Sequence, residues 1–162
     1  MLCNGDSTLI ITENNKKILI DGGGQENYDV GENILLPYLL DRNINKIDYI
    51  IISHLDSDHF KVLIYVIEKI KIKNIIISEQ VKITENYKEL INLVNSKKIK
   101  LIYIKEGDKI NLNKNTKIEF LYPTKKLNFN DLNNNSIVAK FTYKEISMLF
   151  TGDIEEEAEK EI

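Results

Sequence analysis

His54-Leu-Asp-Ser-Asp-His59 follows directly on the apolar run Tyr49-Ile-Ile-Ile-Ser53 and holds both histidines of the chain together with two aspartates. The apolar run predicts a buried strand, and the end of such a strand is where an α/β protein displays its functional groups. Imidazole and carboxylate groups are ligands of hydrolytic divalent metals. The stretch therefore predicts a metal site at the edge of a sheet.

The spacing of these side chains suggests how they could share the ligation. If the chain stays extended past Ser53, His54 and Asp56 project to the same side and could hold one ion. Asp58 and His59 would then turn toward a second position nearby, so the segment suits one or two ions. An EF-hand calcium loop beginning at Asp56 would need a glycine and a glutamate at positions where this chain has neither. A solvated acidic turn with incidental histidines remains the alternative.

Composition limits the range of functions. A chain of 162 residues with 43% hydrophobic content is long enough for one domain with a core. The net charge of -3 gives no support to a polyanionic partner, and lysine clusters such as Lys69-Ile-Lys-Ile-Lys73 are interpreted as solvated faces. Cys3 is the only cysteine, so no intrachain disulfide is expected. The apolar runs are shorter than the roughly 20 residues that span a bilayer, which predicts a soluble or cytoplasmic domain.

The periodicity of the remaining sequence predicts an α/β fold. Strands are expected at 7–12, 17–20, 49–53, 74–78, 99–104, 116–122, 136–143 and 145–151. Helices are expected at 33–42, 61–71, 84–96 and 154–162, the first interrupted by Pro37 and the third capped by Thr84. The order of a hairpin, βα units and then antiparallel strands predicts one mixed sheet, or two packed sheets with helices outside.

The histidine segment resembles the HxHxDH signature of the metallo-β-lactamase fold, in the variant form HxDxDH. Further segments look like the soluble hydrolase domain of ComEC-type competence proteins: Gly5-Asp-Ser-Thr-Leu-Ile10, Ile18-Leu-Ile-Asp-Gly-Gly-Gly24, Leu36-Pro-Tyr-Leu-Leu40, Ile47-Asp-Tyr-Ile-Ile-Ile-Ser-His54, Asn134-Asn-Ser-Ile-Val138 and Leu149-Phe-Thr-Gly-Asp153. They occur in consistent order along the chain. The resemblance implies an αβ/βα sandwich of two facing sheets flanked by helices, with a metal site at the sheet edges.

The resemblance also implies which residues bind the metal. It makes His54, Asp56, Asp58 and His59 the first ligands, and Asp153 the carboxylate that bridges or completes the site. A divalent metal, as one or two ions of zinc or manganese, with magnesium as a further choice, is the implied cofactor. Asp56 stands where the common signature has histidine, and an oxygen ligand tilts the preference from zinc toward manganese or magnesium.

Four residues are expected around the ligands rather than among them. In the resembling family the aspartate that matches Asp21 orients the histidine segment, although an aspartate before three glycines is also ordinary turn chemistry. Asp6, Asn135 and Ser136 would lie near the metal edge, or would simply be polar residues at strand starts. Asp153 likewise has an alternative interpretation, as the N-cap of the C-terminal helix.

These expectations lead to a metal-dependent hydrolase that cleaves phosphodiester bonds of DNA with a metal-activated water, with Asp58 as its catalytic carboxylate. The ComEC-type relatives are proposed to degrade one strand of incoming DNA as nucleases at the membrane, which implies single-stranded DNA as partner and a membrane-anchored parent protein. The alternative is a degenerate, non-catalytic module that binds a metal or a partner. A small-molecule lactonase is a third interpretation, which Asp56 and the ComEC-like segments disfavour.

The resembling family has further histidines after the Thr-Gly-Asp segment, whereas this sequence ends at Ile162 with no third histidine. We therefore expect residues 1–162 to form a single metallo-β-lactamase-like domain that is incomplete at its C-terminal side. Such a chain would be weakly active or inactive by itself. It would also expose apolar faces that promote self-association.

Overall fold

The structure is a computed structural model of the chain, and it describes residues 6–24, 29–79, 82–124, 131–160 and 162. Cys3 and Gly5, on which two of the sequence observations fall, lie outside the described residues.

The first sheet has five strands in the order β1-β2-β3-β4-β5. The strands are β1 Thr8–Ile11, β2 Lys17–Ile20, β3 Lys46–Ile51, β4 Lys71–Ser78 and β5 Lys100–Ile104. β1 pairs antiparallel with β2, and the other pairs are parallel. The run Ile75-Ile-Ile77 in β4 is buried on both faces, as expected for a central parallel strand covered on each side.

The second sheet has four antiparallel strands in the order β6-β7-β8-β9. They are β6 Lys109–Asn113, β7 Thr116–Tyr122, β8 Val138–Tyr143 and β9 Ile146–Phe150. β7 alternates buried and half-buried residues throughout its length, which is the pattern of a strand with one face on the core. Its other face carries Lys117, Glu119 and Leu121, and Glu119 forms ion pairs with Lys109 at 2.7 Å and with Lys117 at 2.8 Å.

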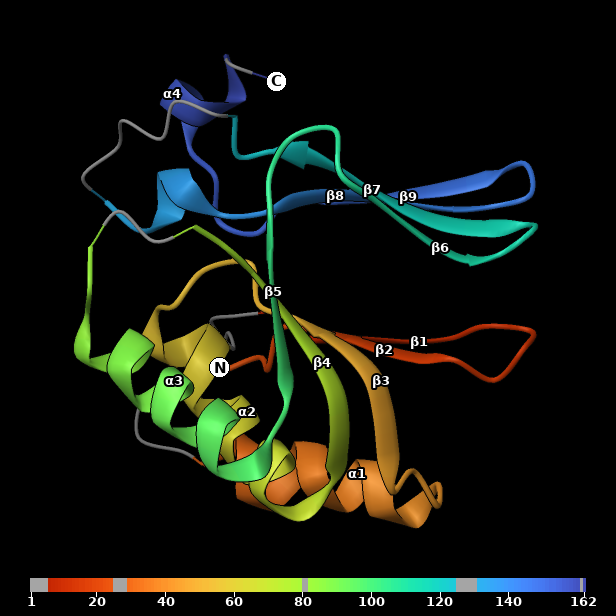
Figure 1. Ribbon diagram of the computed structural model, residues 1–162, viewed down its shortest axis with the longest axis vertical. Coiled ribbons are helices and arrows are strands. Elements are labelled where there is room, and N and C mark those ends of the chain that lie inside the picture. Colours follow the sequence, from red (N-terminus) through yellow and green to blue (C-terminus); the bar gives the residue numbers. More distant parts are fainter. Residues whose placement is uncertain (1–5, 25–28, 80–81, 125–130, 161) are drawn as a thin grey trace.

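Helices cover the outer face of the first sheet (Figure 1). The helical segments are η1 Gly31–Leu35, α1 Leu36–Asp41, α2 Ser57–Lys69, α3 Glu85–Lys97, η2 Asn133–Asn135 and α4 Glu156–Glu159. α2 has apolar residues at helical spacing, with Phe60, Leu63 and Ile67 on one buried face. Because this face packs on the sheet, the first turn of α2 is held rigidly beside the ends of the strands.

Two apolar layers hold the molecule together. The helix-side layer contains Leu19, Ile50, Leu63 and their neighbours, all of them buried. The second layer lies between the facing sheets and joins Ile51 of the first sheet to Phe120 of the second. The molecule is thus a helix–sheet–sheet arrangement of one mixed and one antiparallel sheet, which confirms the predicted α/β class.

The predicted elements are present, with shifted boundaries. The hairpin of β1 and β2 and the Thr84 cap of α3 are confirmed, since Thr84 Oγ1 accepts a hydrogen bond of 3.2 Å from the amide of Tyr87. Pro37 is accommodated because a short π-helical turn precedes it and places it in the first turn of α1. β6 was not predicted, because its residues Lys109–Asn113 give a weak apolar signal.

One boundary matters for the site. The helix expected at 61–71 begins at Ser57, so Asp58 and His59 lie in the first turn of α2 and not in an extended loop. The helix expected at 154–162 is also shorter and spans only Glu156–Glu159 among the described residues. Both differences lie at helix ends, which are the least sharply defined parts of a helix.

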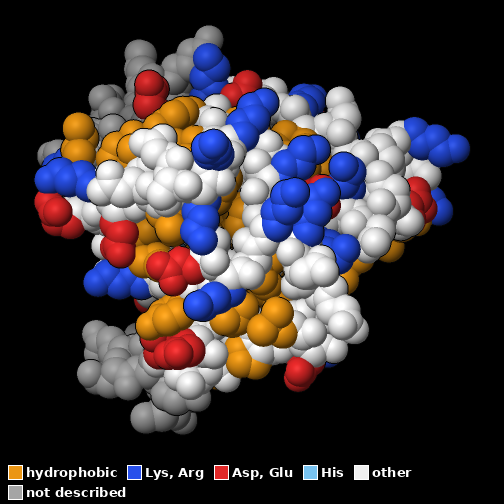
Figure 2. All heavy atoms as spheres, turned by 60° about the horizontal axis from the view of Figure 1, so that its bottom comes forward, with side chains coloured by type: hydrophobic (Ala, Val, Ile, Leu, Met, Phe, Trp, Pro, Cys, Tyr) orange, Lys and Arg blue, Asp and Glu red, His pale blue; other side chains and the backbone are white. Residues whose placement is uncertain are grey.

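The lysine clusters lie on the surface. Lys71, Lys73 and Lys100 are exposed at the beginnings of β4 and β5. Figure 2 turns the helix layer toward the viewer and shows basic, acidic and hydrophobic side chains together on this face. Within the described ranges, no helix is long and apolar enough to cross a membrane.

Candidate metal centre

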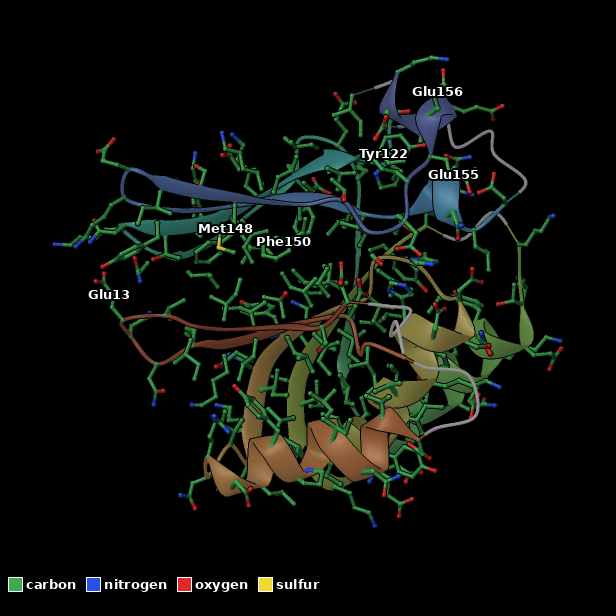
Figure 3. The ribbon with its side chains drawn as sticks, turned by 180° about the vertical axis from the view of Figure 1, so that it is seen from behind. Glu13, Tyr122, Met148, Phe150, Glu155 and Glu156 are labelled. Carbon is green, nitrogen blue, oxygen red and sulfur yellow. The ribbon has the colours of Figure 1, made fainter. Side chains whose placement is uncertain are left out.

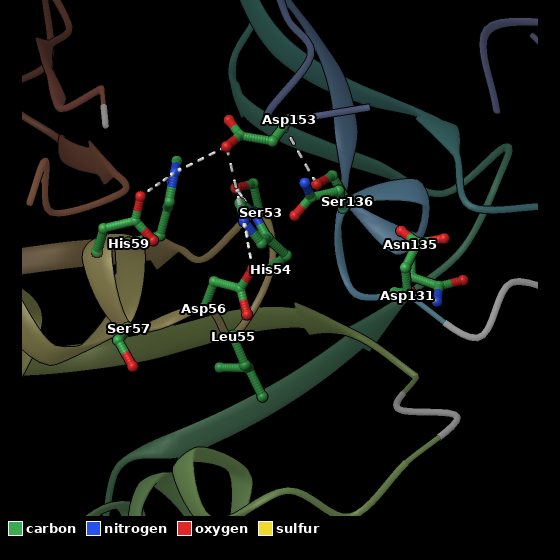
Figure 4. Close-up of polar contacts among 12 residues, drawn as sticks. Ser53, His54, Leu55, Asp56, Ser57, His59, Asp131, Asn135, Ser136 and Asp153 are labelled. Carbon is green, nitrogen blue, oxygen red and sulfur yellow. Dashed lines mark hydrogen bonds and ion pairs between the residues drawn. The ribbon is translucent and has the colours of Figure 1, made fainter. Parts of the chain in front are cut away.

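The candidate site lies where both sheets end (Figure 4). β3 ends at Ile51 and α2 begins at Ser57, and the connection between them carries His54 and Asp56. Asp153 follows the last strand of the second sheet, β9. Residues about 100 positions apart in the sequence therefore meet at one edge of the sandwich.

Two imidazoles and one carboxylate face one another at this edge. Asp153 Oδ2 lies 3.4 Å from His59 Nε2 and 3.9 Å from His54 Nε2. The histidine rings are 4.2 Å apart between centroids. The ligand atoms of these three residues all lie within 4.8 Å of one another, which is close enough to hold a single ion.

The two histidines are buried but not satisfied. His54 is 3% exposed and His59 is 1% exposed. Nε2 of His54 and Nε2 of His59 have no hydrogen-bond partner among the described residues, while Nδ1 of His59 lies 3.4 Å from Asp21 Oδ2. Leaving buried polar atoms unpaired costs on the order of 1–3 kcal/mol each, so the arrangement calls for a further partner. A divalent cation between the Nε2 atoms and Asp153 fits this requirement, and the donor set fits the cation.

Asp56 and Asp58 each lie beside one histidine. Asp56 Oδ2 is 3.8 Å from His54 Nε2, and Asp58 Oδ2 is 3.8 Å from His59 Nε2. Asp56 occupies the N-cap position of α2, yet its carboxylate makes no capping hydrogen bond. An aspartate that gives up its capping bond and turns toward a histidine is available to a metal. Three of the five residues predicted as ligands, His54, His59 and Asp153, thus form one cluster, and Asp56 and Asp58 each lie beside one of its histidines.

Asp21 is buried beneath the histidine segment. Its Oδ1 accepts a hydrogen bond of 2.7 Å from the amide of Ser53, and its Oδ2 lies 3.4 Å from Nδ1 of His59. It also has a left-handed backbone, with φ of 54°, at the end of β2. Asp21 therefore combines turn geometry with the orienting position that the resemblance implies.

The carboxylates and the burial act on the two histidines in different ways. Burial lowers the pKa of His59, but Asp21, Asp153 and Asp58 outweigh this effect and raise it to about 9. Burial and the charge of His59 lower the pKa of His54 more than the nearby carboxylates raise it. The site therefore favours a neutral His54 beside a charged His59 when no metal is bound.

Asp153 is presented by a tight backbone. Gly152 has φ of 55°, and a Cβ on it would lie 2.8 Å from the Cβ of Ser53 and 2.9 Å from that of Ser136. The amide of Asp153 donates a hydrogen bond of 3.3 Å to Ser136 Oγ. The alternative interpretation of Asp153 as a helix N-cap is wrong, because α4 begins at Glu156 and its N-cap is Glu155.

The other predicted residues lie at different depths around the site. Asp6 lines a small cleft of about 120 Å³ together with Asp21, His59 and Asp153. Ser136 is fully buried and holds the Asp153 backbone. Asn135 is buried one position away, and its side-chain amide donates to the carbonyl of Asp131 at 2.6 Å.

Two residues that shape the site were not predicted from the sequence. Ser53 bonds both to Asp21 and to His54, and Gly152 allows the two sheets to approach each other. Ser53 had one visible signal, since it is a polar residue at the end of an apolar run and directly precedes His54.

Comparison with known proteins identifies the family. The model of the metallo-beta-lactamase superfamily matches residues 1–162. The chain belongs to the metallo-β-lactamase superfamily. Members of this superfamily are generally metal-dependent hydrolases, and their fold binds divalent metals. The predicted family is therefore confirmed, while the ComEC-like subgroup stays a prediction. A search of curated proteins gives no significant match.

Solved structures with the metallo-β-lactamase fold resemble this chain over most of its length. A metal-soaked flavodiiron core from Synechocystis sp. PCC6803 shows 21% identity and a TM-score of 0.60, covering 90% of this chain and 32% of its own. The flavodiiron protein from Giardia intestinalis shows 19% identity, a TM-score of 0.60 and coverages of 90% and 31%. A diphosphatase of the PhnP family shows 14% identity, a TM-score of 0.55 and coverages of 96% and 55%. The chain thus spans about a third of the flavodiiron chains and just over half of the diphosphatase.

Proposed function

We propose that this protein is a metal-dependent phosphodiesterase that cleaves DNA, as in the ComEC-type hydrolases that its motifs resemble. The observation that carries the proposal is the pair of buried, unpartnered Nε2 atoms of His54 and His59 facing the carboxylate of Asp153. A set of two imidazoles with several carboxylates favours a divalent ion with affinity for oxygen as well as nitrogen. We infer zinc or manganese, with magnesium as the next choice.

Each residue has a role in the proposed reaction. His54, His59 and Asp153 hold the ion, and Asp56 adds a carboxylate on the side of His54. An ion bound there would lower the pKa of a bound water and offset the negative charge that develops at phosphorus. Asp58 is partly exposed and lies beside His59, so it can accept the proton of the attacking water. Single-stranded DNA is the proposed substrate.

The test combines metal binding with cleavage. Metal-free protein is titrated with Zn²⁺, Mn²⁺ and Mg²⁺ by calorimetry, and each form is then incubated with a labelled single-stranded oligonucleotide. We expect micromolar or tighter binding of Zn²⁺ or Mn²⁺ and metal-dependent cleavage. Asp58→Asn should reduce the cleavage rate by about a hundredfold or more, as expected for loss of a general base.

Glu85→Gln is the matched control, because Glu85 is also an acidic residue in the first turn of a helix but lies on α3. It should leave binding and cleavage unchanged. Metal binding without cleavage of DNA would favour the alternative of a non-catalytic metal-binding module. If the protein neither binds a metal ion nor cleaves DNA, the proposal is overturned.

A further inference from the structure

Ser53 lies at the point where the two sheets meet beside the site. It is 2% exposed, and its amide is bonded to Asp21 while its carbonyl accepts a hydrogen bond of 2.8 Å from the amide of Ile137. Gly152 approaches its side chain from the second sheet. The backbone of Ser53 is therefore fixed from both sheets, which leaves its hydroxyl little freedom of position.

The hydroxyl of Ser53 is directed at the ring of His54. Ser53 Oγ and His54 Nδ1 are 2.9 Å apart and both are buried (Figure 4). On the other side of the ring, the nearest carboxylates lie 3.8 and 3.9 Å from Nε2 and form no hydrogen bond with it. A serine hydroxyl can accept a hydrogen bond from Nδ1–H or donate one to an unprotonated Nδ1, and only the first arrangement leaves Nε2 without a proton.

The position of this proton decides whether His54 can bind a metal. A neutral imidazole ligates through the nitrogen that carries no proton, and the proton on the other nitrogen needs an acceptor. With the proton on Nδ1, the lone pair of Nε2 points toward Asp153 and the candidate ion position. With the proton on Nε2, the same ring would be unable to act as a ligand there.

We propose that Ser53 is a positioning residue that holds His54 in the Nδ1–H tautomer and so prepares Nε2 for the metal. The proposal deepens the proposed function and rests on it for the identity of the ligand. Ser53 was predicted neither as a metal ligand nor as one of the residues around the ligands. Ser57 offers the internal comparison, because it belongs to the same segment but bonds only weakly, at 3.4 Å, with Asn86 of α3.

The test uses Ser53→Ala, Ser53→Thr and the control Ser57→Ala, each labelled with ¹⁵N-histidine. The chain has only two histidines, so the imidazole signals are simple, and His59→Gln assigns them. For the wild type and Ser57→Ala at neutral pH we expect the Nδ1–H tautomer of His54 with and without Zn²⁺. Ser53→Ala should lose this preference in the metal-free protein and bind Zn²⁺ about 10–100-fold more weakly. Ser53→Thr, which keeps a hydroxyl, should restore both.

The outcomes separate this proposal from the proposed function. An Nε2–H tautomer in the metal-free wild type, or a Ser53→Ala variant with unchanged tautomer and unchanged affinity for Zn²⁺, would overturn the role of Ser53 even if the protein cleaves DNA. The protein could instead show an Nδ1–H tautomer of His54 that depends on Ser53, and bind Zn²⁺ without cleaving DNA. That result would support the role of Ser53 and reject the proposed hydrolase. Unfolding curves of the metal-free variants serve as a check, because an unchanged free energy of unfolding shows that the substitution alters the ring of His54 and not the fold.

Discussion

The two sheets contact each other differently at the two ends of the sandwich, the hairpin end with Glu13 and the metal end with His54 and His59. At the hairpin end lies Glu13 (Figure 3), which accepts hydrogen bonds from the hydroxyl of Tyr143 at 2.9 Å and from the side-chain amide of Asn115 at 3.2 Å. These groups are exposed or at the surface, and each has a partner. At the metal end, His54 and His59 are buried and their Nε2 atoms have no hydrogen-bond partner in the described part of the chain.

The difference predicts that the end with His54 and His59 is the functional one. A satisfied surface cluster stabilises the fold modestly and needs nothing more. Buried unsatisfied nitrogens lower stability unless something binds them, so they indicate a site that is kept for a ligand.

Gly152→Ala should give the largest loss of stability. An added Cβ would meet Ser53 and Ser136 below 3 Å, and φ is 55°. We expect the free energy of unfolding to fall by about 3 kcal/mol, from left-handed strain and overpacking together. Gly107→Ala is the control, because φ is 85° there but nothing lies within 4 Å, so the loss should be only about 1 kcal/mol. Equal losses in urea unfolding would show that the close approach at Gly152 is unimportant.

His59→Gln should weaken Zn²⁺ binding by about a hundredfold or more, since it removes a direct ligand and not a supporting group. Calorimetric titration of metal-free protein measures the change. Glu13→Gln, at the opposite end of the sandwich, should bind Zn²⁺ as the wild type does. If both variants bind equally well, the metal end is not a metal site.

Metal affinity should depend on pH through His59. Because its pKa is about 9 in the metal-free protein, a metal must displace a proton from this ring below pH 9. The dissociation constant should therefore rise about tenfold for each unit that the pH falls below 9. In the folded, metal-free protein the pKa of His59 is raised above 6.5. The stabilisation that the charged His59 contributes is therefore full below pH 6.5 and is lost as the pH rises through 9. A pH-independent affinity between pH 7 and 9 would contradict the charged state of His59.

The hairpin end should respond only to acid, and weakly. Hydrogen bonds from Tyr143 and Asn115 lower the pKa of Glu13 below 4.5. Its contribution is therefore present above pH 4.5 and is lost as the pH falls through the lowered value. Glu13→Gln should reduce Tm slightly at pH 7, and the difference should disappear at pH 3. A difference that persists in acid would mean that the carboxylate charge is not what matters.

Local patterns in the sequence were sufficient for most elements. The apolar run ending at Ser53, the hairpin and the Thr84 cap depend on neighbouring residues, and each was predicted. The start of α2 and the strand β6 were wrong or missed, because burial of Phe60 and pairing with β7 decide them more than local propensity. Self-association stays a prediction, although β9 has exposed apolar residues at Ile146, Met148 and Leu149.

The sequence was enough to predict the family and a candidate set of metal ligands, because both histidines and two of the aspartates lie within one short segment. It also named Asp153 and Asp21 through the resemblance. That His54, His59 and Asp153 form one cluster is visible only in the folded chain, since it requires the end of β9 to reach the end of β3 across two sheets. The proposed role of Ser53 also rests on the fold, because adjacency in the sequence does not fix the 2.9 Å contact between Ser53 Oγ and His54 Nδ1.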